Sequence, residues 1–267
     1  MNTPPSSEHI QRFKQDGYLV FDFALDDSLL EAIKRGVYPL YDEKFRNGEV
    51  PTTRVQDVWR EVEAARVLAR QPNIMAALEQ LFGSAALPFQ TLNFPVGTQQ
   101  LPHSDTIHFN SKPRGYMAGV WVALEDIDAD NGPLIYYPGS HRLPEYSMQD
   151  LGLGTGYEYY KDYEQKVQGL INKHALQPEY GTIKKVEALI RHANLLQGGA
   201  PQKDMSRSRH SQVTHYYFAD CEYYTPMNSD GKSVRYRRPE WVADVPLDEY
   251  VPVRPSLLER IKPRLIR

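Results

Sequence analysis

The sequence predicts a mostly β protein, a sandwich or barrel with helices around it. From Leu87 onward, short extended runs alternate with Gly, Pro, Asn and Asp, which is typical of sandwiches and barrels. Before that point, apolar residues such as Leu29, Ile33 and Val37 recur at helical spacing. A chain of 267 residues can bury one substantial core, so a single domain is expected.

The expected domain has a helical N-terminal part, a β core with one insertion, and an extended C-terminal tail. These cover residues 7–83, 86–220, 145–181 and 221–267, in that order. Asp26 or Asp27 caps one expected helix, and Gly83 ends another. Further helices are expected over residues 8–16, 57–69, 73–82 and 158–173. Strands are expected over residues 18–23, 89–94, 103–109, 116–124, 134–137, 186–190, 193–196 and 209–219.

Composition excludes several classes of partner. The net charge of −3 and the pI of 6.3 give no basic field for nucleic acid or an anionic membrane. The basic stretch 260–267 is expected to be a solvated tail, and the single cysteine, Cys221, excludes an internal disulfide. No signal peptide is expected, and the longest apolar run, 117–124, is too short to span a bilayer. We therefore expect a soluble, cytoplasmic protein, and the sequence leaves its oligomeric state open.

A candidate metal site begins at His103 and Asp105, two residues apart on an expected strand. Residues i and i+2 of a strand face the same side, so both side chains can point into a barrel mouth. One imidazole, one carboxylate and a third ligand from elsewhere form the facial arrangement that leaves positions open on Fe(II).

Several motifs together resemble the phytanoyl-CoA dioxygenase family of Fe(II)/2-oxoglutarate oxygenases. They are the His103-Ser-Asp105 run and the segments 119–126, 131–134 and 138–141, which occur in the family's order and spacing. The resemblance covers residues 10–220. It implies a double-stranded β-helix (jelly-roll, cupin-like) core, iron held by His-x-Asp and a distal histidine, and an arginine that holds 2-oxoglutarate.

The resemblance extends to cofactor-binding residues. Arg209 best matches the family's arginine, and Ser211, two residues on, shares its face. An arginine suits this task because its planar fork meets a carboxylate with two charge-assisted hydrogen bonds. Arg207 is the alternative if the register differs, and Trp121 matches an aromatic position of the co-substrate pocket or is simply a core tryptophan.

The distal ligand position is the departure from the family pattern. Gln197 stands where the resemblance implies a histidine before glycine. An amide oxygen is a poorer donor to Fe(II) than an imidazole, so weaker iron binding is expected. Three interpretations remain open: a working His103, Asp105 and Gln197 set, a non-catalytic relative, or an engineered inactivation.

Other histidines and tyrosines are weaker candidates. His215 shares the parity of Arg209 and can reach the pocket, although a hydrogen-bonded core histidine is the simpler interpretation. Turn, core or outward-facing roles are expected for His108, His141, His192 and His210. Tyrosines around residues 157–163, 216–217 and 223–224 either line a pocket or pack the insertion onto the barrel.

The expected function is hydroxylation of a small-molecule substrate with Fe(II) and 2-oxoglutarate, giving succinate and CO2. Retention of Asp105 favours hydroxylation over halogenation, since related halogenases carry a small residue there. A catalytically silent module that binds a small ligand or a protein is the alternative. A sugar-binding or isomerase barrel is disfavoured because Arg209 and Ser211 would then have no special task. The sequence does not name the substrate.

Overall fold

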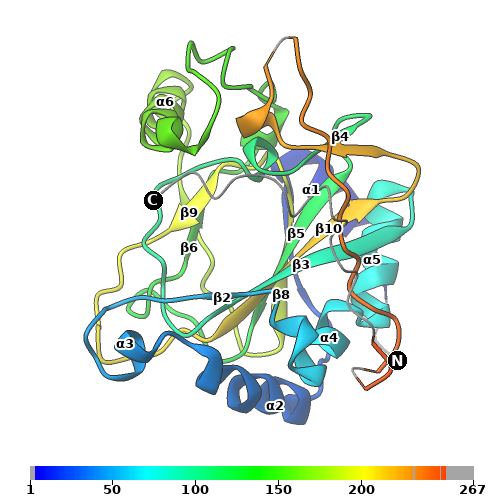
Figure 1. Cartoon of the computed structure of the whole chain (residues 1–267), viewed down its shortest axis with the longest axis vertical. Coiled ribbons are helices and arrows are strands. Elements are labelled where there is room, and N and C mark those ends of the chain that lie inside the picture. The colour runs from blue at the N-terminus through cyan, green and yellow to red at the C-terminus, as the bar shows by residue number, and fades with distance from the viewer. Residues whose placement is uncertain (1–3, 231, 247, 251–267) are drawn as a thin grey trace, which may run out of the picture.

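The computed structural model describes residues 4–230, 232–246 and 248–250. Its centre is an antiparallel sheet of six strands in the order β1-β8-β5-β10-β3-β2 (Figure 1). The strands are β1 (Tyr18–Asp22), β8 (Glu187–His192), β5 (Met117–Ala123), β10 (Ser211–Phe218), β3 (Ala86–Phe94) and β2 (Val55–Gln56). The non-sequential order brings segments from both ends of the chain together, as a barrel-like β fold requires.

Helices cover one face of this sheet. They are α1 (Ser7–Asp16), α2 (Asp27–Val37), α3 (Glu43–Arg46), α4 (Glu63–Ala69) and α5 (Pro72–Phe82). Asp26 caps α2, and Gly83 ends α5 in the left-handed conformation, as expected. Val120 and Val122 of β5 pack against this helical layer, where Leu30 is fully buried.

The opposite face of the main sheet packs on a smaller sheet. This second sheet contains β7 (Glu179–Tyr180), β6 (Leu134–Tyr136) and β9 (Gln197–Gly199). Trp121 alternates with the outward valines of β5 and joins Leu189, Val213 and Tyr136 in an inner core. A separate pair is formed by β4 (Asn110–Lys112) and β11 (Glu222–Tyr224). Mostly β sheets with flanking helices are therefore confirmed.

The insertion folds locally. It contains α6 (Tyr160–Lys173), close to the expected helix, and Figure 1 shows α6 at one end of the molecule, away from α2 and α3. Tyr163, Val167 and Ile171 of α6 pack into a core with Leu196, next to β9. The short 3-10 helices are η1 (Tyr38–Leu40), η2 (Val58–Arg60), η3 (Asp105–Ile107), η4 (Ser140–Arg142), η5 (Tyr157–Tyr159) and η6 (Pro226–Asn228).

Several expected elements were wrong. Residues 103–109 form no strand: His103 makes an isolated bridge with Gln197, and η3 follows it. The strand expected over residues 193–196 is a turn between β8 and β9, and the helix expected over 57–69 divides into η2 and α4. The strand expected over residues 18–23 is present as β1, at one edge of the main sheet.

The basic stretch 260–267 lies outside the described residues. Where the chain is described, no helix is long and apolar enough to cross a membrane.

Candidate active site

A polar row of residues crosses the inner face of the main sheet. Gly119 on β5 lies opposite both Arg191 on β8 and His215 on β10. His215 in turn lies opposite Gln90 on β3, and its Nδ1 is 2.9 Å from the Gln90 side-chain oxygen. The row is thus fixed by strand register across four strands.

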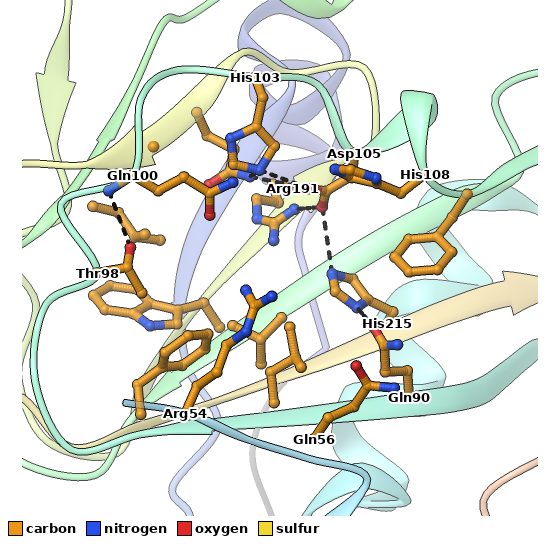
Figure 2. A pocket seen from close by; sticks show the side chains of 18 of the residues that line it. Arg54, Gln56, Gln90, Thr98, Gln100, His103, Asp105, His108, Arg191 and His215 are labelled. Carbon is orange, nitrogen blue, oxygen red and sulfur yellow. Dashed lines mark hydrogen bonds and ion pairs between the residues drawn. The ribbon is translucent and has the colours of Figure 1, made fainter. Parts of the chain in front are cut away.

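This row lines a cavity of about 490 Å³. The volume falls within the range of about 300–1,000 Å³ that is usual for small-molecule sites. In Figure 2, His103 and Asp105 lie at one end of the cavity, and Arg54 and Gln56 lie at the other. Five of the six residues expected at the site line this cavity: His103, Asp105, Trp121, Gln197 and Arg209. The sixth, Ser211, is not in the lining but contacts Arg209.

The backbone brings His103 and Gln197 side by side. The His103 N–H donates to the Gln197 carbonyl at 2.8 Å, and the Gln197 N–H donates back at 2.9 Å. The Asp105 N–H donates to the Ala193 carbonyl at 3.0 Å, which extends this pairing. A side chain at Gly198 would meet the Gln100 carbonyl at 2.6 Å, so glycine permits the close approach of the two segments. His103 and Asp105 converge, but through this bridge rather than on one strand.

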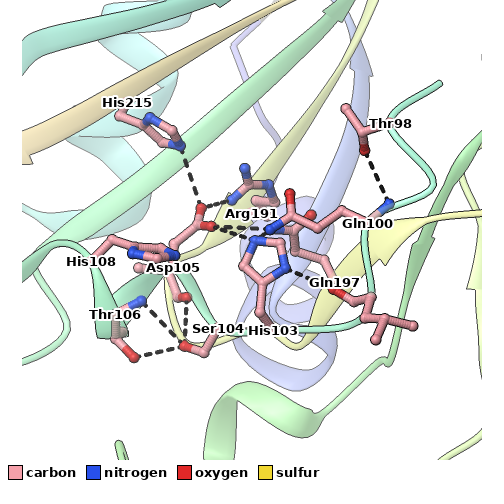
Figure 3. Close-up of polar contacts among 12 residues, drawn as sticks. Thr98, Gln100, His103, Ser104, Asp105, Thr106, His108, Arg191, Gln197 and His215 are labelled. Atoms are coloured by element: carbon pink, nitrogen blue, oxygen red, sulfur yellow. Dashed lines mark hydrogen bonds and ion pairs between the residues drawn. The ribbon is translucent and has the colours of Figure 1, made fainter. Parts of the chain in front are cut away.

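The side chains of His103, Gln197 and Asp105 meet at one point (Figure 3). His103 Nδ1 lies 2.9 Å from the Leu101 carbonyl oxygen, which can only accept. The Nδ1 therefore carries the proton in the neutral ring, and the Nε2 lone pair points inward. Gln197 Nε2 lies 3.0 Å from both His103 Nε2 and Asp105 Oδ1, so its two hydrogens serve both acceptors. An amide N–H₂ group thus occupies the lone pairs of the two ligands expected for iron.

Asp105 is also paired with a cation that the sequence analysis missed. Asp105 is 5% exposed, and its carboxylate forms an ion pair with the guanidinium of Arg191, a residue that is 4% exposed. His215 Nε2 lies 3.4 Å from Asp105 Oδ2. Burial opposes ionisation, but the charge of the Arg191 guanidinium holds the pKa of Asp105 well below its usual range. The carboxylate is therefore charged, and its charge is already balanced.

Gly119 makes the ion pair possible. A side chain there would meet the Arg191 guanidinium at 2.6 Å, and Arg191 would be forced away from Asp105. Strand β8 was expected to end at residue 190, which placed Arg191 in a turn. Once β8 runs to His192, the parity of Arg191 with the inward-facing Leu189 directs it into the cavity.

The donor set fits a divalent ion when one group rotates. Across the described residues, no three His, Cys, Asp or Glu side chains form a metal-binding group. The side chain beside His103 and Asp105 that could offer a further donor is that of Gln197. The Nδ1–H···O=C bond of His103 is the contact that orients metal-binding histidines. Rotating the Gln197 amide by a half turn replaces its nitrogen with an oxygen donor. His103 Nε2, Asp105 Oδ1 and Gln197 Oε1 then face one position.

Arg209 lies at another part of the same cavity. It is 2% exposed, its Nη1 donates to Ser211 Oγ at 2.6 Å, and its Nη2 donates to the Val96 carbonyl at 3.3 Å. The guanidinium carbon lies 5.4 Å from the centre of the Trp121 ring. Burial lowers the pKa of Arg209 to about 10. Arg209 forms no ion pair within the described chain, and its Nε has no partner. A buried, unbalanced cation favours an anionic ligand.

Arg207, the alternative to Arg209, does not reach the cavity. It forms an exposed ion pair with Asp128 at 2.8 Å. The strand register therefore favours Arg209 for any role inside the cavity.

The insertion and its neighbours form an aromatic wall. Tyr157 stacks on His108 with ring centres 5.7 Å apart, and Tyr160 lies 5.3 Å from the same ring. His108 was expected to point away from the site, which was wrong because the strand assumed there does not exist. Burial lowers the pKa of His108 to about 3, so the ring is neutral. Tyr163, by contrast, packs in the core and contacts the Ser104 N–H.

The remaining histidines lie outside the lining of the cavity, as expected for structural roles. His141 contacts the Lys14 carbonyl, His192 packs beside His141, and His210 lies near Tyr41. His215 does reach the cavity, in keeping with its parity with Arg209.

Comparison with known proteins relates the chain to one family. The family model described as phytanoyl-CoA dioxygenase (PhyH) matches residues 13–178, which include His103 and Asp105 but not Arg191, Gln197 or Arg209. A probable phytanoyl-CoA dioxygenase of Caenorhabditis elegans is 26% identical over 135 residues, 45% of this chain and 43% of that protein. The peroxisomal phytanoyl-CoA dioxygenase of Rattus norvegicus is 24% identical over 193 residues, 68% of this chain and 54% of that protein. The chain spans about half the length of these curated relatives.

Solved structures share the fold. The non-heme alpha ketoglutarate dependent carbocyclase SnoK superposes with a TM-score of 0.68 at 15% identity, covering 83% of this chain and 90% of SnoK. The epimerase SnoN, in complex with Fe3+, alpha ketoglutarate and nogalamycin RO, superposes with a TM-score of 0.63 at 20% identity, covering 87% of this chain and 93% of SnoN. EctD from S. alaskensis, with 2-oxoglutarate and 5-hydroxyectoine, superposes with a TM-score of 0.62 at 18% identity, covering 92% of this chain and 86% of EctD. These likenesses confirm the expected jelly-roll core.

Arg191→Gln is predicted to raise the affinity for Mn(II), measured by calorimetry, by at least about tenfold. A tenfold change is about 1.4 kcal/mol, less than the roughly 4 kcal/mol between unit charges 4 Å apart at an effective dielectric constant of about 20. Without metal the variant should be less stable, by about 3–5 kcal/mol, because Asp105 loses its buried partner. Arg207→Gln, which breaks an exposed Arg–Asp pair, is the matched control. An unchanged or lower Mn(II) affinity in Arg191→Gln would contradict the competition between Arg191 and a metal.

Proposed function

Because the chain belongs to the phytanoyl-CoA dioxygenase family, we propose that it is a non-haem Fe(II)/2-oxoglutarate-dependent dioxygenase that hydroxylates a small molecule, with succinate and CO2 as co-products. The observation that carries the proposal is the convergence of His103 Nε2, Asp105 Oδ1 and the Gln197 amide at one point of a cavity that also contains Arg209. Related structures that hold Fe3+ or 2-oxoglutarate support it.

In this proposal His103, Asp105 and Gln197 hold the ion. When bound, ferrous iron supplies open coordination positions for the co-substrate and for oxygen. Leu101 fixes the His103 ring by accepting from Nδ1, and Arg191 holds the Asp105 carboxylate in its ionised form. The protein's contribution is therefore to orient two ligands and to keep one of them charged.

Arg209 and Ser211 would hold the far carboxylate of 2-oxoglutarate. Ser211 Oγ accepts from Arg209 Nη1, so its own hydrogen remains available for the ligand. The rings of Trp121 and Phe94, with centres 5.4 Å and 5.7 Å from the guanidinium carbon, exclude water around this contact. A charge-assisted hydrogen bond is stronger in such surroundings than in water.

A second candidate function is a catalytically silent module that binds a small anion. The ion pair between Arg191 and Asp105 favours it, because the carboxylate needs no metal to balance its charge. The Gln197 N–H₂ group likewise satisfies His103 and Asp105 without an ion. Both candidates use Arg209, and they differ in whether the ion binds.

Anaerobic addition of Fe(II) and 2-oxoglutarate distinguishes the two. We expect the visible charge-transfer band that these two produce when they bind together. Absence of the band, with no iron retained at equilibrium, would rule out the oxygenase and leave the silent module.

The same titration on Gln197→His tests the third ligand. An imidazole is the better donor, so the iron affinity should rise by at least about tenfold, and uncoupled succinate formation should rise with it. Gln56→His, in the same cavity but at its opposite end, is the control. If neither quantity changes in Gln197→His, residue 197 is not a ligand position.

Arg209→Gln is predicted to weaken 2-oxoglutarate binding, measured by calorimetry, by roughly thirtyfold, since a charged hydrogen bond is worth about 2 kcal/mol. Arg207→Gln should leave the affinity unchanged, because Arg207 pairs with Asp128 at the surface. Equal losses in both variants would show that overall charge, and not the site at Arg209, governs binding.

A further inference from the structure

The charges of the cavity do not balance. Four arginines line it, and Asp105 is the only carboxylate among the lining residues. Arg191 is paired with Asp105, and the proposed function assigns Arg209 to the co-substrate. Arg54 and Arg237 remain, and neither has a carboxylate partner among residues 4–230, 232–246 and 248–250. Two cations are thus left over for a second ligand.

Arg237 is held in place as part of the cavity wall. Its guanidinium carbon lies 4.8 Å from the centre of the Phe109 ring, and its Nη1 donates to Thr225 Oγ1 at 3.2 Å. Its Nε is buried and has no hydrogen-bond partner in the described structure. The side chain is therefore positioned in advance, and its hydrogen-bonding capacity is not used up.

Arg54 is the second of these two arginines in the lining of the cavity. It directly precedes β2, whose pairing with β3 fixes the backbone through Val55 and Gln56. Figure 2 shows its side chain extending from the strand edge into the middle of the cavity. In the described part of the chain it makes no side-chain hydrogen bond or ion pair. It is free to close on a ligand.

Both arginines line the cavity that contains the aromatic wall. Burial raises the pKa of Tyr157, and the charges of Arg237 and Arg54 partly oppose this rise. Tyr157 is stacked on His108 with an angle of 8° between the rings. The stacked rings and both arginines thus line one cavity, and Tyr157 is 57% exposed.

We propose that the substrate is a small anion, with a carboxylate or a phosphate on a flat unsaturated body, and that Arg54 and Arg237 bind its anionic group. The guanidinium fork suits both oxyanions. The aromatic wall accepts the flat body, since ring stacking contributes beyond simple burial of area. A neutral analogue would leave both arginines without a partner. This inference rests on the proposed function only where it assigns Arg209 to 2-oxoglutarate.

Calorimetry on the full chain saturated with 2-oxoglutarate tests the proposal, with phenylacetate, phenyl phosphate and neutral phenylacetamide as probes. At least one anion should bind at least about tenfold more tightly than phenylacetamide. The stronger of the two anions identifies the group as carboxylate or phosphate. Equal binding of the amide, or no binding of either anion, overturns the proposal.

Variants locate the contact. Arg54→Gln and Arg237→Gln should each weaken binding of the preferred anion by at least about tenfold and leave the affinity for 2-oxoglutarate unchanged. Arg12→Gln, an exposed arginine of α1 outside the cavity, is the control. Arg54 lies in an exposed segment, so its variant decides the matter even if Arg237→Gln fails to fold.

Failure of this inference is distinguishable from failure of the proposed function. If the anions displace 2-oxoglutarate and depend on Arg209, they occupy the co-substrate position and the second anion site does not exist. If Arg54→Gln leaves anion binding unchanged, the proposal is overturned while the iron and 2-oxoglutarate titration stands on its own.

Discussion

The buried carboxylate of Asp105 is the group on which the rest of the site depends. A charge removed from water is costly unless partners compensate it, and Asp105 has partners from separate parts of the fold. Arg191 comes from β8, His215 from β10 and Gln197 from β9. The carboxylate therefore links β8 and β10 of the main sheet to β9 of the small sheet.

The guanidinium of Arg191 and the proposed metal ion compete for the same carboxylate. His103 and Gln197 are neutral donors, so Asp105 brings the only negative charge to the proposed ion, and Arg191 already balances it. Loading an ion then requires the Gln197 amide to turn and the ion to bind beside a guanidinium. Whether the chain works as an oxygenase is decided by this local competition and not by the fold, since one fold supports both outcomes.

The sequence predicted the fold better than the local path of the chain. The alternation along β5 separates Val120 and Val122 from Trp121, and this period is readable without a structure. His103 and Asp105 were identified for a wrong geometric reason, since they converge through a bridge to Gln197. Arg191 was missed because one strand boundary was placed too early. Strand β8 runs to His192 because it pairs with β1 and β5, and local sequence propensity does not encode such tertiary pairing.

We propose that His103, Asp105 and Gln197 share one ion beside the guanidinium of Arg191. Anomalous diffraction from crystals grown with Mn(II) and 2-oxoglutarate in the absence of oxygen tests it most directly. We expect a manganese peak in contact with His103 Nε2, Asp105 Oδ1 and the side-chain oxygen of Gln197. Density for 2-oxoglutarate at Arg209, with no anomalous peak and with Gln197 still bonded to His103 and Asp105, would contradict it.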